Sequence, residues 1–342
     1  MATERSKGSN PSAKRRYLVT GGAGFVGSHL AERLLADGNA VVVMDDLSTG
    51  RLDNLKPLEG YAGFDYVIDS VANEPLLMNI CGDVDAIFHL AAGVGVMNVV
   101  RSPVQTMEST LYGTEIVLHC ASQAGDKKVL LTSSSEVYGK GTRVPFREDD
   151  DMLFGPTSKS RWSYGCSKAI DEFLALAYHR EMKLPVVIVR LFNTVGPRQV
   201  GTFGMVLPRF VAQALAGGPI TVYGDGEQTR CFVDVSDVVD ALCTLMDTDG
   251  AVGTVMNLGS DEEISINALA ERVRDRVAPE VAVTHTPYDE AYADGFEDLQ
   301  RRVPDVSRVR DLIGFKPTKT LDEIIDAVAE ELRMKQQKIN DL

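Results

Sequence analysis

The sequence predicts an α/β protein with a doubly wound parallel sheet and a second, smaller α/β lobe. Its 342 residues are too many for one average core and fit a large lobe fused to a smaller one. Short continuous apolar segments alternate with longer segments of helical periodicity, which is the pattern of βαβ units whose strands are covered on both faces. After Asn193, glycine and proline become frequent and this alternation weakens, which indicates the second lobe.

The expected elements follow one another as strand, helix and strand. Strands are expected at 17–20, 40–44, 66–69, 86–90, 128–132 and 185–190, and helices at 28–37, 104–124 and 162–182. Near the end of the chain, Leu321, Ile324 and Val328 share one face of an amphipathic helix. Thr320 followed by Glu323 has the spacing of a capping box, which predicts that this helix begins there.

Composition and charge exclude several classes of function. The chain has 35 Lys and Arg against 49 Asp and Glu, a net charge of −14, so it is a poor general binder of nucleic acid or of anionic membranes. It has no apolar run of the length that spans a membrane. The five cysteines, an odd number without a CxxC pair, predict reduced thiols and a cytoplasmic location. The five histidines lack the spacing of metal ligands, so no metal site is expected.

A glycine-rich segment at 20–27, TGGAGFVG, is typical of a dinucleotide-binding turn because a strand precedes it and a helix follows. In such a turn Gly21 permits the sharp bend, Gly24 lets a pyrophosphate approach the backbone, and Gly27 allows close helix packing. Asp45 lies 18 residues after Gly27, where a carboxylate can hold the ribose hydroxyls. The structural alternative is a helix-packing turn without a ligand.

The predicted cofactor is NAD, because an acid at position 45 disfavours the 2′-phosphate of NADP, although Arg51 nearby leaves NADP open. Asp69 ends a strand and could contact the adenine or simply close a turn. The candidate cofactor-binding residues are Gly21, Gly24, Phe25, Val26, Gly27, Asp45, Asp46, Asp69, Leu90, Ala91, Tyr164 and Lys168. We expect a disordered tail at 1–14, an NAD-binding lobe at 15–190 with about 231–257, and a substrate lobe at 191–230 with about 258–335.

Tyr164 and Lys168 form a Tyr-x-x-x-Lys motif in the helix expected at 162–182. Residues i and i+4 share a helix face, so the lysine ammonium would lower the pKa of the phenol and let Tyr164 act as a general base. Alone, the motif is also typical of a tyrosine packed over a lysine stem. The polar segment at 133–136 follows a strand, so its side chains are expected at the same sheet edge as the glycine turn.

Five segments together carry a family resemblance: TGGAGFVG, SSSEVYG, YGCSK, RLFNTVGPR and TVYGDGEQTR. In this order they resemble the extended short-chain dehydrogenase/reductases that act on nucleotide sugars, from about residue 15 to about residue 330. The resemblance implies a Rossmann-type fold, a UDP-sugar substrate, and a homodimer formed through the helices at 104–124 and 162–182. It also implies that Tyr164 is the base, that Lys168 activates it and binds the ribose, and that Ser134 contacts the sugar O4.

Within that family, the triplet Ser134-Ser135-Glu136 resembles UDP-glucuronate decarboxylases. Dehydratases typically carry an Asp before this Glu, and epimerases typically lack the Glu. The segment FEDLQRRVP at 296–304, which begins with Phe296 where a related decarboxylase carries Tyr, resembles the Arg-x-Pro-Asp segment of the decarboxylases. By this resemblance Arg302 is the candidate for binding the glucuronate carboxylate.

The resemblance therefore implies oxidation of UDP-glucuronate at C4 and loss of carbon dioxide, giving UDP-xylose or the UDP-4-keto-pentose. The catalytic candidates are Ser134, Glu136, Tyr164, Lys168 and Arg302, and the substrate-binding candidates are Ser135, Arg161, Asn193, Arg198, Thr221, Tyr223, Arg230 and Arg302. Glu136 is the candidate for proton delivery, or it could orient a backbone amide, and Arg302 could instead form a surface ion pair. A UDP-sugar 4-epimerase and a catalytically silent NAD-binding sensor or scaffold are the alternative functions.

Overall fold

The computed structural model describes residues 14–92, 102–201, 205–291 and 299–340. The tail expected at 1–14, apart from Lys14, and Phe296 therefore lie outside the described residues. None of the described helices is both long enough and apolar enough to cross a membrane.

A seven-stranded parallel sheet forms the centre of the molecule, in the order β11-β6-β5-β4-β1-β2-β3. Its strands are β1 Arg16–Thr20, β2 Ala40–Asp45, β3 Phe64–Ile68, β4 Ala86–His89, β5 Lys128–Ser134, β6 Val186–Leu191 and β11 Thr254–Leu258. The strand order reverses between β1 and β4, and ligands of such sheets bind beyond the carboxyl ends of the strands at this point. The doubly wound α/β fold that the sequence predicts is therefore confirmed.

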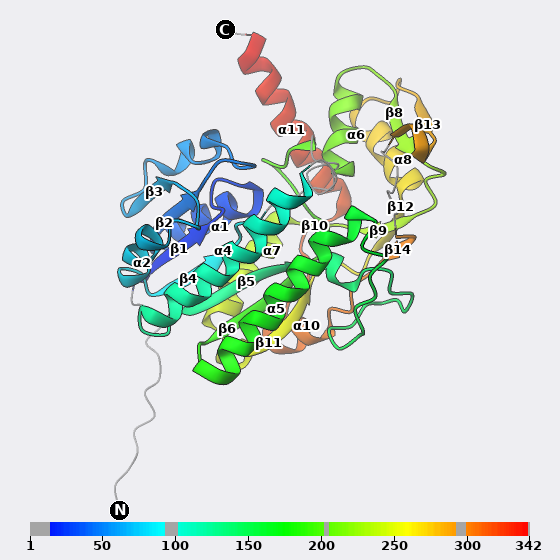
Figure 1. Cartoon of the computed structure of the whole chain (residues 1–342). Helices are drawn as coiled ribbons and strands as arrows, with labels where there is room; N and C mark the ends of the chain where they lie inside the picture. Colours follow the sequence, from blue (N-terminus) through cyan, green and yellow to red (C-terminus); the bar gives the residue numbers. More distant parts are fainter. Residues whose placement is uncertain (1–13, 93–101, 202–204, 292–298, 341–342) are drawn as a thin grey trace, which may run out of the picture.

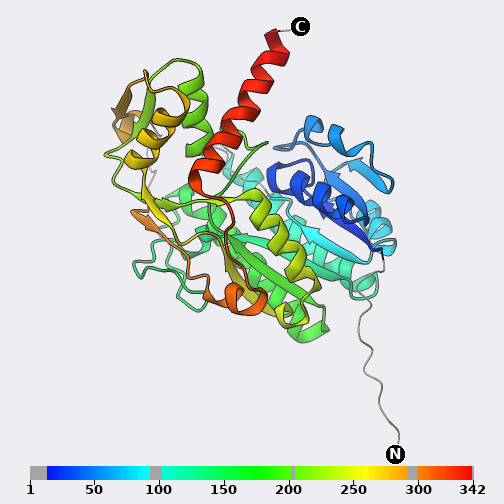
Figure 2. The same ribbon diagram turned by 180° about the vertical axis from the view of Figure 1, so that it is seen from behind.

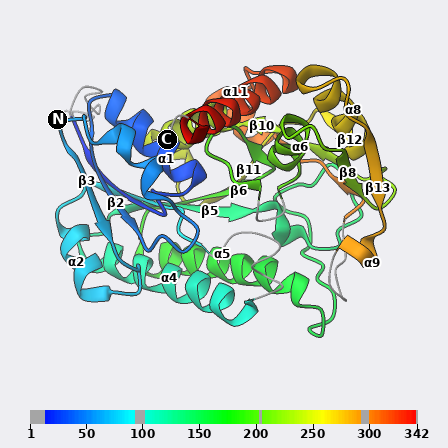
Figure 3. The ribbon, with the colours of Figure 1, turned by 90° about the horizontal axis from the view of Figure 1, so that it is seen from above.

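Helices cover both faces of the sheet, as the apolar strands require. One face carries α2 Glu74–Gly82, α4 Pro103–Gln123 and α5 Ser163–Met182, and α4 lies alongside α5 (Figure 3). The other face, seen from behind in Figure 2, carries α1 Phe25–Ala36, α7 Val235–Asp247 and α10 Ser307–Ile313. The two sides of the sheet thus have separate apolar cores.

The second lobe has a core of its own and lies beyond one end of the sheet (Figure 1). Its helices are α6 Val206–Leu215, α8 Ile266–Val277, α9 Tyr288–Ala291 and α11 Leu321–Asn340. Its short strands are paired as β8 Ile220–Tyr223 with β13 Val283–Thr286, and as β12 Glu263–Ser265 with β9 Thr229–Cys231 and β14 Arg301–Arg302. Between the lobes, β7 Thr194–Val195 pairs with β10 Val233–Asp234.

Several boundaries differ from the expected ones. The helix expected from residue 28 begins at Phe25, because Gly24 is already its N-cap and the second half of the glycine segment is helical. The strand expected to end at 132 continues as β5 to Ser134, where Ser133 and Ser134 still pair with β6. Residues 306–315, expected in the substrate lobe, pack instead against the sheet through Val306, Val309 and Phe315, because α10 covers β11.

The start of the last helix agrees with its predicted capping box. The Glu323 N–H donates to Thr320 Oγ1 at 3.3 Å, and the Thr320 N–H donates to Glu323 Oε2 at 2.8 Å. This reciprocal pair satisfies two backbone donors that the first helical turn leaves without partners. The capping box therefore holds α11 Leu321–Asn340 at its first turn.

Candidate active site

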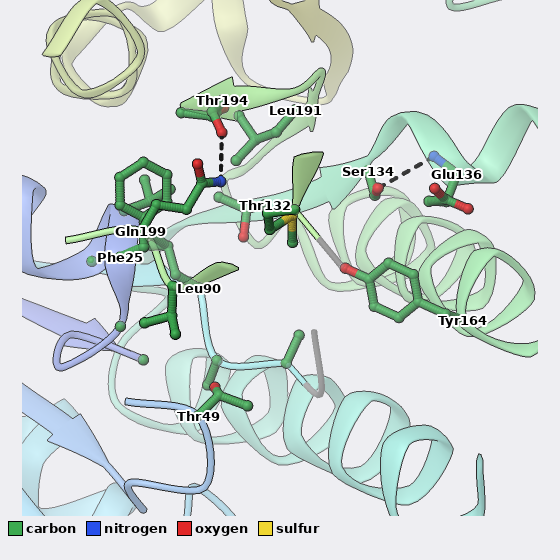
Figure 4. A pocket seen from close by; sticks show the side chains of 18 of the residues that line it. Phe25, Thr49, Leu90, Thr132, Ser134, Glu136, Tyr164, Leu191, Thr194 and Gln199 are labelled. Carbon is green, nitrogen blue, oxygen red and sulfur yellow. Dashed lines mark hydrogen bonds between the residues drawn. The ribbon is translucent and has the colours of Figure 1, made fainter. Parts of the chain in front are cut away.

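A cavity of about 680 Å³ lies where the edge of the sheet meets the second lobe. Its wall comes from the glycine segment after β1, from the ends of β4, β5 and β6, and from residues of α6 and β8 to β9. Figure 4 shows Phe25, Leu90 and Thr49 toward one end, and Ser134, Glu136 and Tyr164 toward the other. The cavity therefore joins the predicted cofactor residues to the predicted catalytic residues.

The glycine segment shapes one end of this cavity. Gly21 has a φ of +69°, and a Cβ there would lie 2.7 Å from the Ala91 backbone nitrogen, so only glycine fits. A Cβ on Gly27 would overlap the Gly21 carbonyl oxygen, so glycine at 27 lets α1 pack closely on the turn. Gly24 caps α1 without a side chain, which leaves the helix N-terminus open toward the cavity.

Asp45 at the end of β2 is buried and accepts a hydrogen bond from the backbone of the glycine segment. Its Oδ2 accepts the Ala23 N–H at 2.9 Å, and its Oδ1 accepts the Leu47 N–H at 2.8 Å. Burial raises the pKa of Asp45, while these backbone donors act in the opposite direction. Asp45 thus fixes the glycine segment besides facing the cavity.

All of the candidate cofactor-binding residues line this one cavity. They are Gly21, Gly24, Phe25, Val26, Gly27, Asp45, Asp46, Asp69, Leu90, Ala91, Tyr164 and Lys168. Five separate segments of the chain contribute them, so the fold brings together residues that the sequence motifs place far apart.

Tyr164 stands in the first turn of α5, with its hydroxyl directed toward the middle of the cavity (Figure 4). The Ser134 hydroxyl hydrogen-bonds with the phenol and favours its ionised form. Burial, followed by the charges of Glu136 and Asp171, nevertheless raises the pKa of Tyr164 above its usual range. That the Lys168 ammonium favours the phenolate of Tyr164 stays a prediction.

The partner of Lys168 is a residue that the sequence analysis missed. Lys168 Nζ donates to Asp171 Oδ2 at 3.0 Å, and both side chains are almost completely buried. Next to this pair, His89 bridges the hydroxyls of Thr20 and Thr114. Burial lowers the pKa of His89 to about 3, so its imidazole is neutral.

Glu136 lies between two arginines at the other side of Tyr164. Arg161 Nη1 donates to Glu136 Oε2, and Arg302 Nη1 lies 2.7 Å from Glu136 Oε1. Burial raises the pKa of Glu136, but Arg302 and Arg161 outweigh it and hold the pKa well below its usual range. The carboxylate is therefore ionised, and in this state it cannot donate a proton.

Strand pairing brings the arginines of the second lobe to the cavity. In the parallel pair of β14 with β9, Arg302 is the register partner of Arg230, so the two side chains share a face. The β14 segment is itself held by Phe146, whose N–H donates to the Val303 carbonyl at 2.8 Å. Arg230 Nη1 donates to the Leu299 carbonyl at 2.9 Å, which fixes its guanidinium at the cavity wall.

Of the substrate-binding candidates, all but one line the cavity. Those that do are Ser135, Arg161, Asn193, Arg198, Tyr223, Arg230 and Arg302. Thr221 is not among the lining residues, and its backbone is hydrogen-bonded to the side chains of Gln213 and Arg209. Arg209 of α6, which the sequence analysis overlooked, lines the cavity with its guanidinium 4.0 Å from the Tyr223 ring centroid.

Comparisons with known proteins agree with this geometry. The model of the GDP-mannose 4,6 dehydratase family matches residues 18–328. The chain belongs to this family. A relative in it, UDP-N-acetyl-alpha-D-glucosaminuronate decarboxylase of Bacillus cytotoxicus, is 40% identical over 91% of this chain and 95% of its own length. UDP-glucuronic acid decarboxylase 1 of Arabidopsis thaliana is 37% identical over 93% of this chain and 70% of its own length.

Solved structures of the family share the whole fold. The UDP-glucuronic acid 4-epimerase from Bacillus cereus, in complex with UDP-glucuronic acid and NAD, superposes with a TM-score of 0.82. It is 26% identical, and the match covers 94% of this chain and 99% of that one. The extended dehydrogenase/reductase resemblance drawn from the sequence motifs is thereby confirmed.

Proposed function

We propose that the chain is an NAD-dependent decarboxylase that oxidises UDP-glucuronate at C4 and removes its C6 carboxylate. The observation that carries the proposal is the buried cluster of Arg161, Glu136 and Arg302 beside Tyr164 in one cavity. Two guanidiniums facing a single carboxylate leave one positive charge for a substrate carboxylate. The names of relatives at 37–40% identity, which are decarboxylases of two UDP-hexuronates, support the same reaction.

NAD fits the end of the cavity that the glycine segment shapes. A Cβ at Gly21 or Gly27 would collide with the surrounding backbone, so the tight turn requires glycine at both positions. The open N-terminus of α1 at Gly24 suits a pyrophosphate. The carboxylate of Asp45 faces the same space, where it would hold ribose hydroxyls and repel a 2′-phosphate. When bound, NAD accepts the hydride from C4 and can return it to the ketone.

Tyr164 and Ser134 are the groups that would handle the C4 hydroxyl. The phenolate of Tyr164 would take the hydroxyl proton as the hydride leaves, and the Ser134 hydroxyl would hydrogen-bond the same oxygen. The product of this step is a ketone in the position β to the C6 carboxylate. Carbon dioxide can then leave with its bonding electrons remaining on the sugar as an enolate that the ketone delocalises.

The charges of the arginine cluster favour that loss. With the substrate carboxylate present, two guanidiniums face two carboxylates, and the cluster is neutral. Once carbon dioxide has left, the remaining single positive charge can stabilise the enolate. Glu136 thereby prevents the arginines from holding the substrate carboxylate too strongly. Because its pKa is held low, Glu136 carries no proton that it could give to C5. The proton for C5 would therefore come from water, or from Glu136 after the carboxylate has first been protonated.

Mass spectrometry of the products tests this proposal. The purified protein is incubated with NAD and, separately, with UDP-glucuronate, UDP-N-acetylglucosaminuronate and UDP-glucose. A product lighter by carbon dioxide from UDP-glucuronate supports the proposal, and its mass distinguishes the pentose from the 4-keto-pentose. Decarboxylation of the N-acetylated sugar alone would change the substrate, and an isobaric product with a new retention time would indicate a 4-epimerase instead.

A homodimer formed through α4 and α5 belongs to the same proposal. Large apolar side chains are exposed on both helices, namely Tyr112 at 57%, Ile170 at 50% and Phe173 at 66%. The two helices lie side by side (Figure 3), and the proposed interface is the surface formed by their exposed sides, at whose edge Tyr112 also lines the cavity. A second copy of the chain placing its own α4 and α5 there would bury this surface in a four-helix arrangement.

We also propose that the protein works in the cytoplasm. All five cysteines are free thiols, and Cys81, Cys120 and Cys231 are buried. Free thiols persist where the compartment is reducing. Immunolocalisation or fractionation of cells that express the protein tests this expectation, and recovery from the secreted fraction would contradict it.

A further inference from the structure

The counter-ion of Lys168 is an unassigned part of the site. Lys168 and Asp171 are one helical turn apart on α5, and their charged atoms lie 3.0 Å from each other. Their side chains are 2% and 1% exposed, so neither charge can be compensated by solvent. Asp171 lines no part of the cavity, which means that it acts on the reaction only through Lys168 and through its charge.

Neighbouring helices and strands hold this ion pair in place. The Thr114 hydroxyl of α4 stabilises the Asp171 carboxylate, while Asp171 Oδ1 has no well-formed hydrogen bond of its own among the described residues. His89 of β4 reaches Thr114 Oγ1 at 3.2 Å and Thr20 Oγ1 at 2.7 Å. Because the imidazole is neutral, the network adds no further charge, and Lys168 and Asp171 cancel one another.

Tyr164 lies one helical turn before Lys168 on α5, both side chains line the cavity, and the charge of Asp171 acts on the phenol. The groups facing its phenol are the Ser134 hydroxyl from β5, Glu136 from the following turn, and Lys168 and Asp171 from α5. Burial, Glu136 and Asp171 raise the pKa of the phenol, and the Ser134 hydrogen bond lowers it. Glu136 is itself shared between two arginines, so Asp171 is the acid whose effect a single substitution can isolate.

We propose that Asp171 is a positioning residue that holds the Lys168 ammonium at the floor of the cofactor site and offsets its charge. In doing so it sets the pH above which Tyr164 acts as the base. The proposal rests on the proposed role of Tyr164 in oxidising the sugar. It assigns to Asp171 two separable contributions, a hydrogen-bond acceptor for Lys168 and a negative charge near Tyr164.

The variant Asp171→Asn separates these contributions, since it keeps an acceptor of the same shape and removes the charge. With Lys168 no longer offset, the acid limb of the kcat/KM profile for the nucleotide sugar shifts to lower pH by roughly one unit. The Kd for NAD stays within twofold of the wild type. Asp171→Ser, which also loses reach toward Lys168, shows the same shift together with weaker NAD binding. Glu181→Gln removes an exposed acid from the end of the same helix and leaves the profile unchanged.

An acid limb that stays in place, or moves to higher pH, in a folded Asp171→Asn holoenzyme overturns the proposal. Ultraviolet difference titration of the phenol, with Tyr164→Phe as reference, gives a second reading that needs no turnover. A Tyr164 pKa that is not lower in Asp171→Asn than in the wild type overturns the proposal as well. Should the wild type convert no UDP-sugar, the decarboxylase proposal fails, and the titration still decides whether Asp171 controls Tyr164.

Discussion

Adjacent arginines on β14 have opposite surroundings. Arg301 points outward, with its side chain 56% exposed, and pairs with Glu263 at the surface. Arg302 points inward, with 9% exposure, and pairs with Glu136 in the cavity. Successive side chains of a strand point to opposite faces, so one of the two had to face inward. The sequence left open whether Arg302 forms a surface ion pair, and the structure rejects that alternative.

Replacing Glu136 measures how much the ion cluster of Arg161, Glu136 and Arg302 contributes to the free energy of unfolding. Glu136→Gln leaves two buried guanidiniums facing each other without a carboxylate, so the free energy of unfolding at pH 7 should fall by about 3 kcal/mol or more. The pKa of Glu136 is depressed in the folded state. Its stabilisation is thus complete above the usual glutamate range, near pH 4.3, and is lost as the pH falls toward the folded-state value.

Urea denaturation at several pH values measures both effects. The difference between wild type and Glu136→Gln should narrow below about pH 4. Glu263→Gln is the matched control, because it breaks the exposed pair on the neighbouring arginine and should cost less than about 1 kcal/mol. If the two variants lose the same free energy of unfolding, or if the loss in Glu136→Gln does not depend on pH, the stabilising role of the buried ion cluster is contradicted.

Tyr164→Phe tests the base. Without the phenolate, turnover of the nucleotide sugar should fall by about 10²- to 10⁴-fold, because the proposed acceptor of the C4 proton is removed. Isothermal titration should show that NAD and UDP still bind, since the ring remains. Tyr66→Phe changes an exposed tyrosine on β3 and serves as the control. Turnover at the wild-type level in Tyr164→Phe would remove this residue from the mechanism.

Motifs predicted residues that the structure brings together around the cavity, but not the residues that surround them. Gly21, Tyr164 and Lys168 belong to short segments with fixed spacing, which a reader can recognise without the fold. Asp171 gives no comparable signal, because an acid three residues after a lysine usually lies on a solvated helix face. It becomes a buried partner of Lys168 only because α4 packs over that face of α5.

Apolar periodicity predicted the long helices and the buried strands of the central sheet closely. It did not predict the short strands of the second lobe. Strands β9, β12 and β14 have only two or three residues each, which is too short for an alternating pattern to be visible. They form because segments 30 or more residues apart meet side by side. Arg209 on α6 was overlooked because it lies in the region after Asn193, where frequent glycine and proline weaken the alternation of strands and helices.

The apolar surface of α4 and α5 predicts self-association. Phe173→Asp places a charge in the middle of the proposed interface, so sedimentation velocity should show the shift from dimer to monomer at micromolar protein. Met334→Asp substitutes an exposed apolar residue on α11 and should leave the dimer intact. A wild-type protein that is already monomeric, or a Phe173→Asp variant that stays dimeric, would contradict this interface.

At the scale of the whole molecule, Arg198 connects the two lobes beside the cofactor end of the cavity. Its guanidinium pairs with Glu32 of α1 at 2.5 Å, and its backbone N–H donates to Glu331 of α11 at 2.8 Å. The sequence predicts Arg198 as a substrate ligand, and this role stays a prediction. Its contacts with Glu32 and Glu331 give it a second role, which is to join the two lobes.

Stopped-flow measurement of NAD release distinguishes these two roles. Because the pair with Glu32 is partly exposed, Arg198→Ala should speed dissociation of NAD by up to about fivefold, and the KM for the nucleotide sugar should change little. Arg33→Ala breaks the exposed pair of Arg33 with Asp240, which joins α1 to α7 on the outside, and should have no effect. An increased KM with unchanged NAD release would restore the substrate-ligand role.

The most direct test of the central claim follows the C6 carbon. UDP-glucuronate labelled with ¹³C at C6 is incubated with the NAD-loaded protein, and labelled carbon dioxide is measured by membrane-inlet mass spectrometry. The account predicts release by the wild type, none above background by Tyr164→Phe, and strong impairment in Arg302→Ala with NAD binding retained. No release by the wild type, or equal release by Arg302→Ala, would contradict decarboxylation by the cluster of Arg161, Glu136 and Arg302.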